Sequence, residues 1–288
     1  VDNPFEQLCY TLAHWVASFH LAAYQQNPLE PTVGETFQGV IGGCPVYFEQ
    51  LTPVSGTNIE AFQLFGKNFT LQGRWQLSMC LYPHKATGQL LLPSQAIFKN
   101  NGTVVEFLHP PCIITGLAIG KRKIDYSGKF YAWDENNGYF AELICDPPAE
   151  GFWSKKTTLT DYISGRIVKA KPSLFKKVRE ALKKNSSVDI KLKEEDYTEE
   201  VAKVEGSWLD YLKIDDKIYW KFGAVKPHKL LHVKNVLPSD SNVRKDIIYL
   251  KLGKYEEATT ERENIMIKEN DDNKKKKKDQ KGFFSSLF

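Results

Sequence analysis

The most constraining feature of this chain is a long series of short β-type segments with no helical pattern between them. They are rich in β-branched and aromatic residues, and Gly, Pro and Asn turn signals separate them. Such spacing indicates an antiparallel meander, and the segments are too many for a small sandwich, so we predict a large barrel-like sheet. The segments are Thr36–Ile41, Val46–Leu51, Glu60–Phe65, Phe69–Leu81, Gly88–Leu92, Val104–Phe107, Lys123–Trp133, Gly138–Ile144 and Ile163–Val168.

Helical patterns flank this series. Apolar residues at three- and four-residue spacing predict an N-terminal helix over residues 4–24, which Pro28 and Pro31 end. Residues 171–200 interrupt the strand pattern with a short basic helix and an acidic stretch, and strands return at Val201–Leu209 and Lys217–Phe222. The last predicted elements are two helices within residues 243–268 and a lysine-rich tail over 269–288. Because the chain lacks an initial Met and starts almost inside a helical pattern, we expect a fragment or a processed chain.

Composition and motifs exclude several classes of protein. Lys and Arg number 39 against 35 acidic residues, a balance that does not suggest a protein coating nucleic acid. No nucleophile elbow, phosphate-binding loop or zinc-protease motif occurs, so we expect no enzyme and no cofactor.

His228 and His232 would suit a metal only on a helix, and the preceding Lys226-Pro227 argues for loop or strand. The five cysteines form no CxxC pair and are expected to be free thiols in a reducing cytosol. No signal peptide or membrane-spanning stretch is visible.

Three stretches, in order and over most of the chain, resemble the lipid-binding domain of the oxysterol-binding-protein-related family. Residues 24–37 (YQQNPLEPTVGETF) are similar to the family turn KPFNPLLGETF. Glu49-Gln50-Leu51-Thr52 takes the place of the fingerprint EQVSHHPP, and Leu71-Gln72-Gly73 follows as in the family. Residues 237–246 (LPSDSNVRKD) resemble the segment PxDSRxRxD that leads into the C-terminal helices. Only the 171–200 insertion lies outside this similarity.

The resemblance implies a mainly β fold, a large near-complete antiparallel β-barrel around an apolar lipid tunnel, with an N-terminal helix and C-terminal helices. Residues 1–268 would form this domain, with the barrel at about 36–222. The implied function is binding, and possible transfer between membranes, of a sterol or other membrane lipid by a cytoplasmic peripheral membrane protein that acts as a monomer. Burial of several hundred Å2 of apolar ligand surface would dominate the affinity, at about 25 cal/mol per Å2. The alternative is a degenerate membrane-associated sensor or scaffold that carries no lipid.

The head-group positions depart from the family. The paired histidines of the fingerprint have no counterpart after Thr52, and the family lysine before the turn falls on Asn27. The Lys, Glu and Arg that the family spaces four residues apart on its last helix fall on Arg262, Met266 and Asn270. Because a phosphomonoester needs several cationic donors, we predict weakened or absent binding of phosphoinositide-4-phosphate.

Other positions are expected to contact lipid or membrane, although each has a structural alternative. Phe19 and His20 match tunnel-facing positions, and His20 is either a partner for a sterol hydroxyl or a core histidine. Leu29 and Val33 suit the tunnel mouth or ordinary packing, and Gln50 is a mouth residue or part of a strand. The basic helix at 171–184 has either a solvated face or a membrane or partner contact. A pentalysine run with apolar neighbours is expected to contact anionic membranes, unless it is a solvated tail; it consists of Lys274, Lys275, Lys276, Lys277 and Lys278.

Overall fold

The computed structural model describes residues 1–20, 29–53, 58–146, 161–184, 188–224, 226 and 228–285, with the side chains of 270 and 272–285 outside the description. The first element, α1 (Pro4–Phe19), starts at Asn3, whose side-chain oxygen accepts hydrogen bonds from the backbone N–H groups of Phe5 (2.9 Å) and Glu6 (3.2 Å). This N-cap and the proline at the first helical position explain where the helix begins. The rest of the predicted helix, up to residue 24, falls within residues 21–28, which lie outside the described part.

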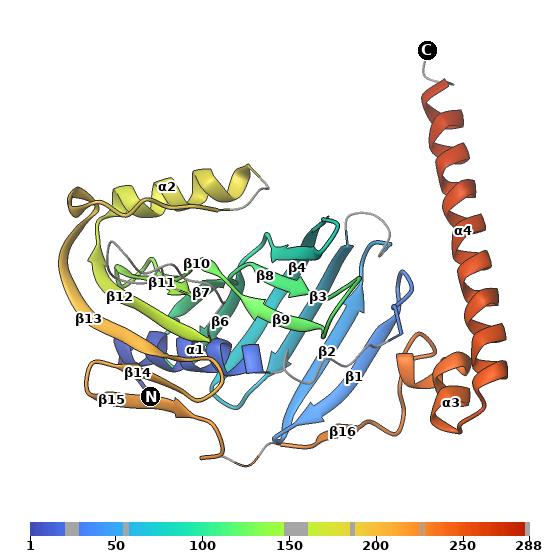
Figure 1. Cartoon of the computed structure of the whole chain (residues 1–288), viewed down its shortest axis with the longest axis horizontal. Helices are drawn as coiled ribbons and strands as arrows, with labels where there is room; N and C mark the ends of the chain where they lie inside the picture. The colour runs from blue at the N-terminus through green and yellow to red at the C-terminus, as the bar shows by residue number, and fades with distance from the viewer. Residues whose placement is uncertain are drawn as a thin grey trace.

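Within the described residues, sixteen strands form one antiparallel sheet (Figure 1). Its main path runs β15-β14-β13-β12-β11-β10-β7-β6-β4-β3-β2-β1-β16, and a branch of β5, β8 and β9 leaves β4. The path ends at β15 and β16 and does not close on itself. The sheet is therefore an open, near-complete barrel, as the family resemblance implied. The strands are β1 (Thr36–Ile41), β2 (Cys44–Gln50), β3 (Asn58–Phe65), β4 (Phe69–Leu81), β5 (Lys85–Leu90), β6 (Ser94–Phe98), β7 (Val104–Leu108), β8 (Cys112–Thr115), β9 (Lys123–Tyr126), β10 (Gly128–Asp134), β11 (Tyr139–Cys145), β12 (Tyr162–Ala170), β13 (Tyr197–Ser207), β14 (Tyr211–Ile214), β15 (Lys217–Lys221) and β16 (Leu230–His232).

The predicted strand boundaries differ from the structure at a few places. The segment Lys123–Trp133 is two strands, because β9 ends at Tyr126 and β10 begins at Gly128, whose φ is +91°. The sheet also extends past residue 222, because β16 pairs with β1 through Gly39 and His232. Four short strands were not among the predicted segments, and apolar and polar residues alternate little in the sequence around them; they are β6, β8, β14 and β16.

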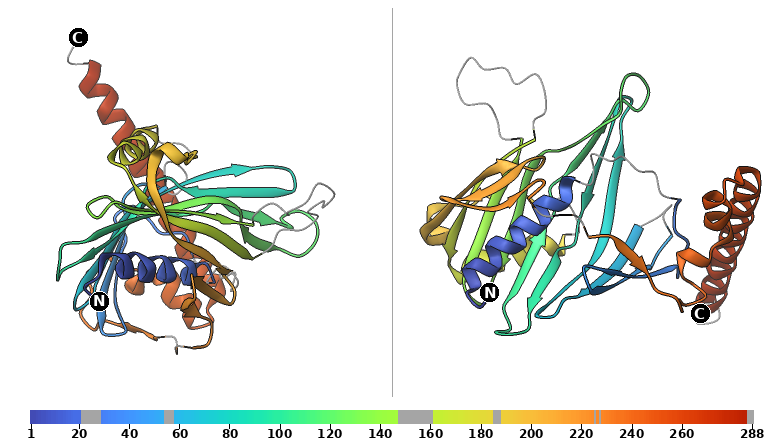
Figure 2. Two further views of the ribbon diagram at one scale, coloured as in Figure 1. Left: turned by 90° about the vertical axis from the view of Figure 1, so that its left-hand side faces the viewer. Right: turned by 90° about the horizontal axis from the view of Figure 1, so that it is seen from below.

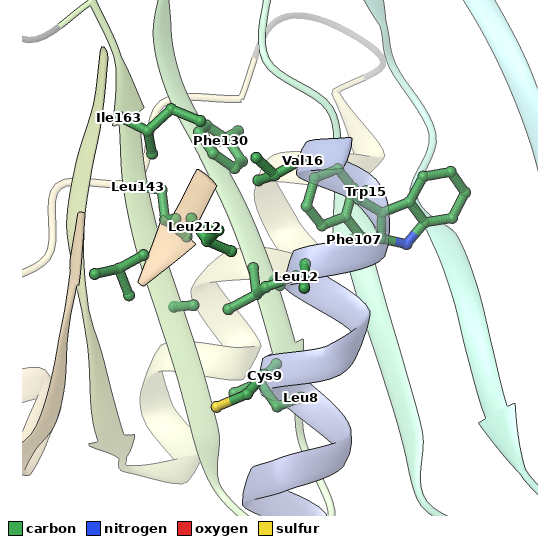
Figure 3. Close-up of a cluster of buried hydrophobic side chains, with 14 of the residues drawn as sticks. Leu8, Cys9, Leu12, Trp15, Val16, Phe107, Phe130, Leu143, Ile163 and Leu212 are labelled. Atoms are coloured by element: carbon green, nitrogen blue, oxygen red, sulfur yellow. The ribbon is translucent and has the colours of Figure 1, made fainter. Parts of the chain in front are cut away.

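The sheet has two faces, each with its own hydrophobic core. We call the face that carries α1 the inner face and the opposite one the outer face. Alternate residues of β10 serve both, because Phe130 and Ala132 pack in the cluster with α1, whereas Tyr131 and Trp133 pack in the second cluster. Figure 2 shows the sheet bending around α1. In Figure 3, Leu8, Leu12 and Val16 of the helix are gathered with the side chains of the neighbouring strands.

The 171–200 segment belongs to the core of the outer face. Helix α2 (Pro172–Lys183) buries Leu174, Phe175 and Val178, and its lysines and arginine lie on the exposed side. The Tyr131 hydroxyl accepts a hydrogen bond from the backbone N–H of Ile190 (2.9 Å), which fixes the chain after the helix. This segment therefore supplies part of the outer-face core. It ends earlier than the predicted residue 200, because β13 already begins at Tyr197.

The C-terminal helices attach beside β1. After a 3-10 turn at Ser241–Val243 come α3 (Lys245–Lys251) and α4 (Tyr255–Ser285). The backbone N–H of Thr36 donates to the Ser239 carbonyl (2.9 Å), and that of Gln38 donates to the Asp240 carboxylate (2.8 Å). The predicted tail at 269–288 is different in the structure, since α4 continues as one helix to Ser285.

Candidate functional site

The inner face beside α1 carries a group of aromatic side chains, some of them buried and some half-buried. Phe48 of β2, Phe62 of β3 and Trp75 of β4 lie on adjacent strands, and the Phe62 and Trp75 ring centroids are 4.6 Å apart. Trp15 of α1 approaches Phe62 edge-on at 6.3 Å. Phe48 and Trp75 are partly exposed, so this apolar surface is accessible and could contact a ligand.

Four buried polar atoms on this face have no hydrogen-bond partner within the described residues. They are the indole Nε1 atoms of Trp15 and Trp208, Nε2 of His109 and the amide Oε1 of Gln50. The Trp15 and His109 rings are in contact, with centroids 4.9 Å apart. Because buried polar groups are nearly always satisfied, these atoms are candidates for a hydrogen bond to a bound water or to a polar group of a ligand.

The His109 imidazole is held in the neutral form. Burial, together with the nearby His14, lowers its pKa to about 3. Burial also lowers the pKa of His14. A neutral imidazole offers one donor and one acceptor, so it can bind a hydroxyl but gives no charge to a phosphate.

We expect these histidines to make the protein acid-sensitive. The unfolded chain takes up protons near the ordinary pKa of 6.5, whereas His109 stays neutral when folded down to about pH 3. Lowering the pH through this window therefore favours unfolding by about 1.4 kcal/mol per pH unit through His109. Urea unfolding of His109→Phe between pH 6.5 and 4.5 should show a slope smaller than that of the unmutated protein by about this amount. An unchanged slope would mean that His109 is protonated in the fold.

Gln50 lies at one end of this face and holds the β2–β3 connection. The side chain is 3% exposed, and its Nε2 donates to the Thr52 carbonyl (2.6 Å) and to Asn58 Oδ1 (2.8 Å). Thr52 Oγ1 accepts a hydrogen bond from the backbone N–H of Ile59 (2.8 Å). Both polar groups therefore support the turn, and burial raises the pKa of the neighbouring Glu60.

A buried charge cluster joins the turn before β1 to the C-terminal helices. Arg244 pairs with Glu35 at 2.6 Å and with Asp246, whose side chain is fully buried. Arg262 Nη1 donates to the Glu30 carbonyl (2.7 Å) and lies 3.8 Å from Asp246. Arg262 is the one predicted head-group position that keeps a positive charge, and its guanidinium group is already paired with Glu30 and Asp246.

Of the other predicted head-group positions on α4, the structure describes the side chain of Met266 but not that of Asn270. Met266 follows Arg262 by one helical turn and is 46% exposed. The neighbouring Glu269 accepts a hydrogen bond from the backbone N–H of Val33 (3.3 Å), so this face of α4 lies against the turn. The backbone of Asn270 and of Lys274–Lys278 lies in α4, and their side chains are outside the described part, as is the whole of Asn27.

Some of the predicted tunnel residues lie in the hydrophobic core, and others lie in or near the turn before β1. Phe19 is 1% exposed and stacks on Tyr126 with ring centroids 4.5 Å apart, as expected for core packing. His20 stacks on Phe222 at 4.3 Å. Leu29 is half-buried and Val33 is 37% exposed in the turn near Gln50. The structure thus brings the turn, Gln50 and the α4 face to one end of the sheet, and leaves Phe19 in the core.

A groove of about 630 Å3 on the outer face was not predicted. A chain of hydrogen bonds crosses it, from Gln63 to Gln72 (3.2 Å), on to Gln95 (3.2 Å) and then to Glu106 (3.1 Å). The Trp133 indole N–H donates to the same carboxylate (2.6 Å). Polar residues at alternate strand positions are the only sequence signal for this row, and pairing across strands decides that they meet.

Among the described residues, no helix combines the length and the apolar character that crossing a membrane requires. In the same part of the chain, no three His, Cys, Asp or Glu side chains are grouped as they would be to hold a metal ion.

Comparisons with known proteins agree with the fold. The Oxysterol-binding protein 9 of Dictyostelium discoideum is 30% identical over 267 residues, which cover 89% of this chain and 58% of that relative. The chain therefore spans less than two thirds of that relative. The Osh3 ORD of Saccharomyces cerevisiae, solved in complex with PI(4)P, matches with a TM-score of 0.70 and 14% identity over 93% of this chain and 70% of its own. The Osh1 ORD domain, solved with cholesterol, matches with a TM-score of 0.63 and 14% identity over 92% and 67%.

The family assignment rests on sequence as well as on fold. The sequence model of the oxysterol-binding protein family matches residues 1–288, including the segment 171–200 that seemed to fall outside the similarity. Its match over the full length confirms the resemblance inferred from the three motifs. This chain belongs to the oxysterol-binding protein family.

Proposed function

We propose that this protein binds a sterol or another single membrane lipid on its inner face and carries it between membranes without catalysis. Two relatives of the same fold were solved with cholesterol and with PI(4)P, so lipid ligands suit this architecture. The observation that carries the proposal is the accessible aromatic surface around Trp75 with unpartnered polar atoms beside it. A lipid with one hydroxyl would bury apolar area there and satisfy one of these atoms.

The ligand is proposed to lack a phosphorylated head group. The family-equivalent positions offer Thr52, Met266 and an Arg262 that is already paired with Glu30 and Asp246. Each missing charged hydrogen bond costs about 1.5–3 kcal/mol, so phosphoinositide-4-phosphate would bind several orders of magnitude more weakly than at a complete site. The protein would then be a one-ligand carrier in the cytoplasm, in peripheral contact with membranes.

A competition assay tests the proposal. The full chain is titrated with a fluorescent sterol, and liposomes containing phosphoinositide-4-phosphate are then added as competitor. We expect saturable sterol binding that the liposomes leave unchanged. Displacement of the sterol at comparable concentrations would contradict the reading of the head-group positions. Absence of sterol binding, with no lipid recovered from the purified protein, would favour a sensor or scaffold that carries no lipid.

A paired substitution locates the ligand. Trp15→Phe removes the unpartnered Nε1–H and keeps most of the ring, so sterol affinity should fall about 2- to 13-fold, the equivalent of a hydrogen bond of 0.5–1.5 kcal/mol. Trp133→Phe is the matched control, because this ring lies on the outer face and donates to Glu106. Equal affinity in both variants would place the lipid away from Trp15.

A further inference from the structure

Two neighbouring loops expose large apolar side chains at one extremity of the sheet. At the β4–β5 turn Met79 is 53%, Leu81 77% and Tyr82 50% exposed, and in the β8–β9 loop Leu117 is 41% and Ile119 92% exposed. We call these five residues the apolar tip. The two loops are adjacent, because Lys85 at the start of β5 pairs with Thr115 at the end of β8. Figure 2 shows this hairpin and the neighbouring loop projecting together from the sheet.

The loop that carries Ile119 has a defined backbone shape. Gly116 and Gly120 both have positive φ, at +71° and +100°. A Cβ atom on Gly116 would lie 2.1 Å from the Lys121 carbonyl oxygen, so the chain closes on itself at this point. Glycine suits Gly116 and Gly120 because of their positive φ, and Leu117 and Ile119 are exposed in the loop so formed.

Basic residues surround the apolar tip. Lys85, Lys121, Arg122 and Lys123 lie in these loops and at the strand ends that they join, and Asp125 is the one acidic residue in the ranges 77–90 and 112–126. Lys85 lies 5.4 Å from the centre of the Tyr82 ring, so a cation accompanies the apolar group. Apolar side chains next to a positive rim match the two layers of an anionic membrane surface, since the acyl region accepts the former and the head groups attract the latter.

We propose that the apolar tip inserts into the interface of an anionic bilayer and docks the protein on it. The position fits this role. Asn58 of β3 pairs with Leu77, so β4 continues past the β2–β3 connection for four further residues, or about 13 Å at 3.3 Å per residue. The Gln50 end of the inner face lies beside this connection, and docking there would bring it close to the membrane. The surface is separate from the lysine run of α4.

Vesicle binding by the full chain tests the proposal. Phosphatidylcholine vesicles with and without phosphatidylserine are sedimented with the unmutated protein, Ile119→Asp and Leu81→Asp. Both side chains are largely exposed, so the variants should fold normally. We expect stronger binding to the phosphatidylserine vesicles, and at least about tenfold weaker binding for each variant, since an apolar anchor is lost. Lys121→Gln with Lys123→Gln should reduce the preference for phosphatidylserine.

Two controls make the result specific. Leu252→Asp removes another largely exposed apolar residue (65%) at the α3–α4 turn and should leave binding unchanged. Replacing Lys274–Lys278 with Gln separates the contribution of the α4 lysines. Wild-type binding by Ile119→Asp would overturn the proposal, as would a dimer in solution that this variant dissociates. Loading with sterol from cyclodextrin, without vesicles, should be normal in Ile119→Asp, so failure of docking and failure of lipid binding are distinguishable.

Discussion

Replacing Arg244 with alanine is expected to lower the free energy of unfolding by about 3–5 kcal/mol. The guanidinium group pairs with Glu35 at 2.6 Å and with Asp246, and it donates to the Glu30 carbonyl at 3.1 Å. The side chains of Glu35 and Asp246 are 8% and 0% exposed, so the substitution leaves two carboxylates buried with fewer partners. Uncompensated buried charge is among the largest costs that a single substitution can cause.

Urea unfolding, followed by circular dichroism, measures this effect. Arg179→Ala is the matched control, because Arg179 also pairs with a carboxylate, that of Glu135, but both side chains are about half exposed. A pair of this kind contributes about 1 kcal/mol or less. Equal losses in the two variants would show that solvent screens the Arg244 cluster. The Arg244 variant should also exchange backbone amide hydrogens faster in residues 29–35, where the cluster holds the turn.

Truncating Phe19 to alanine should cost about 3–5 kcal/mol of stability, because it leaves a cavity in the inner-face core. The ring is 1% exposed, stacks on Tyr126 and lies 5.8 Å from the centre of the Phe130 ring. Thermal and urea unfolding of the purified variant measure the loss. Ser18→Ala on the same helix is the control, since its hydroxyl donates only to the Trp15 carbonyl within the helix.

A second substitution separates packing from ligand contact at this position. Phe19→Leu keeps most of the apolar volume, so we expect a small loss of stability and an unchanged sterol affinity if the ring only packs the core. A fall in sterol affinity with little change in stability would instead restore Phe19 as a residue that lines the lipid site. The two readouts can therefore decide between the two roles that the sequence left open.

Local patterns in the sequence predicted much of the fold. The three- and four-residue spacing of Leu8, Leu12 and Trp15 marks the buried side of α1, since helical geometry places those positions together whatever they contact. Strand β4 matches its predicted boundaries, Phe69–Leu81. The family motifs were recognisable for a related reason, because each is a short continuous stretch around a turn or a helix start.

The candidate site was less predictable. Arg262 keeps a charge in the sequence, yet the structure uses it on Glu30 and Asp246. No signal in the residues around Trp15 or His109 indicates that their ring nitrogens lack partners. The apolar tip was not predicted either, since a large apolar residue such as Ile119 would ordinarily be assigned to a core.

Periodicity and turn residues act between near neighbours, so the order of residues alone indicates an antiparallel sheet with helices at both ends and carries the motifs of a lipid-binding family. The folded chain is needed to see which charges are neutralised, which polar atoms lack partners and which apolar residues remain exposed. The reason is that these properties depend on residues far apart in the chain, as for Arg244 and Glu35, 209 positions apart, or Gly39 and His232 on paired strands. The residues next to each member of such a pair in the sequence do not indicate which distant residue it will contact.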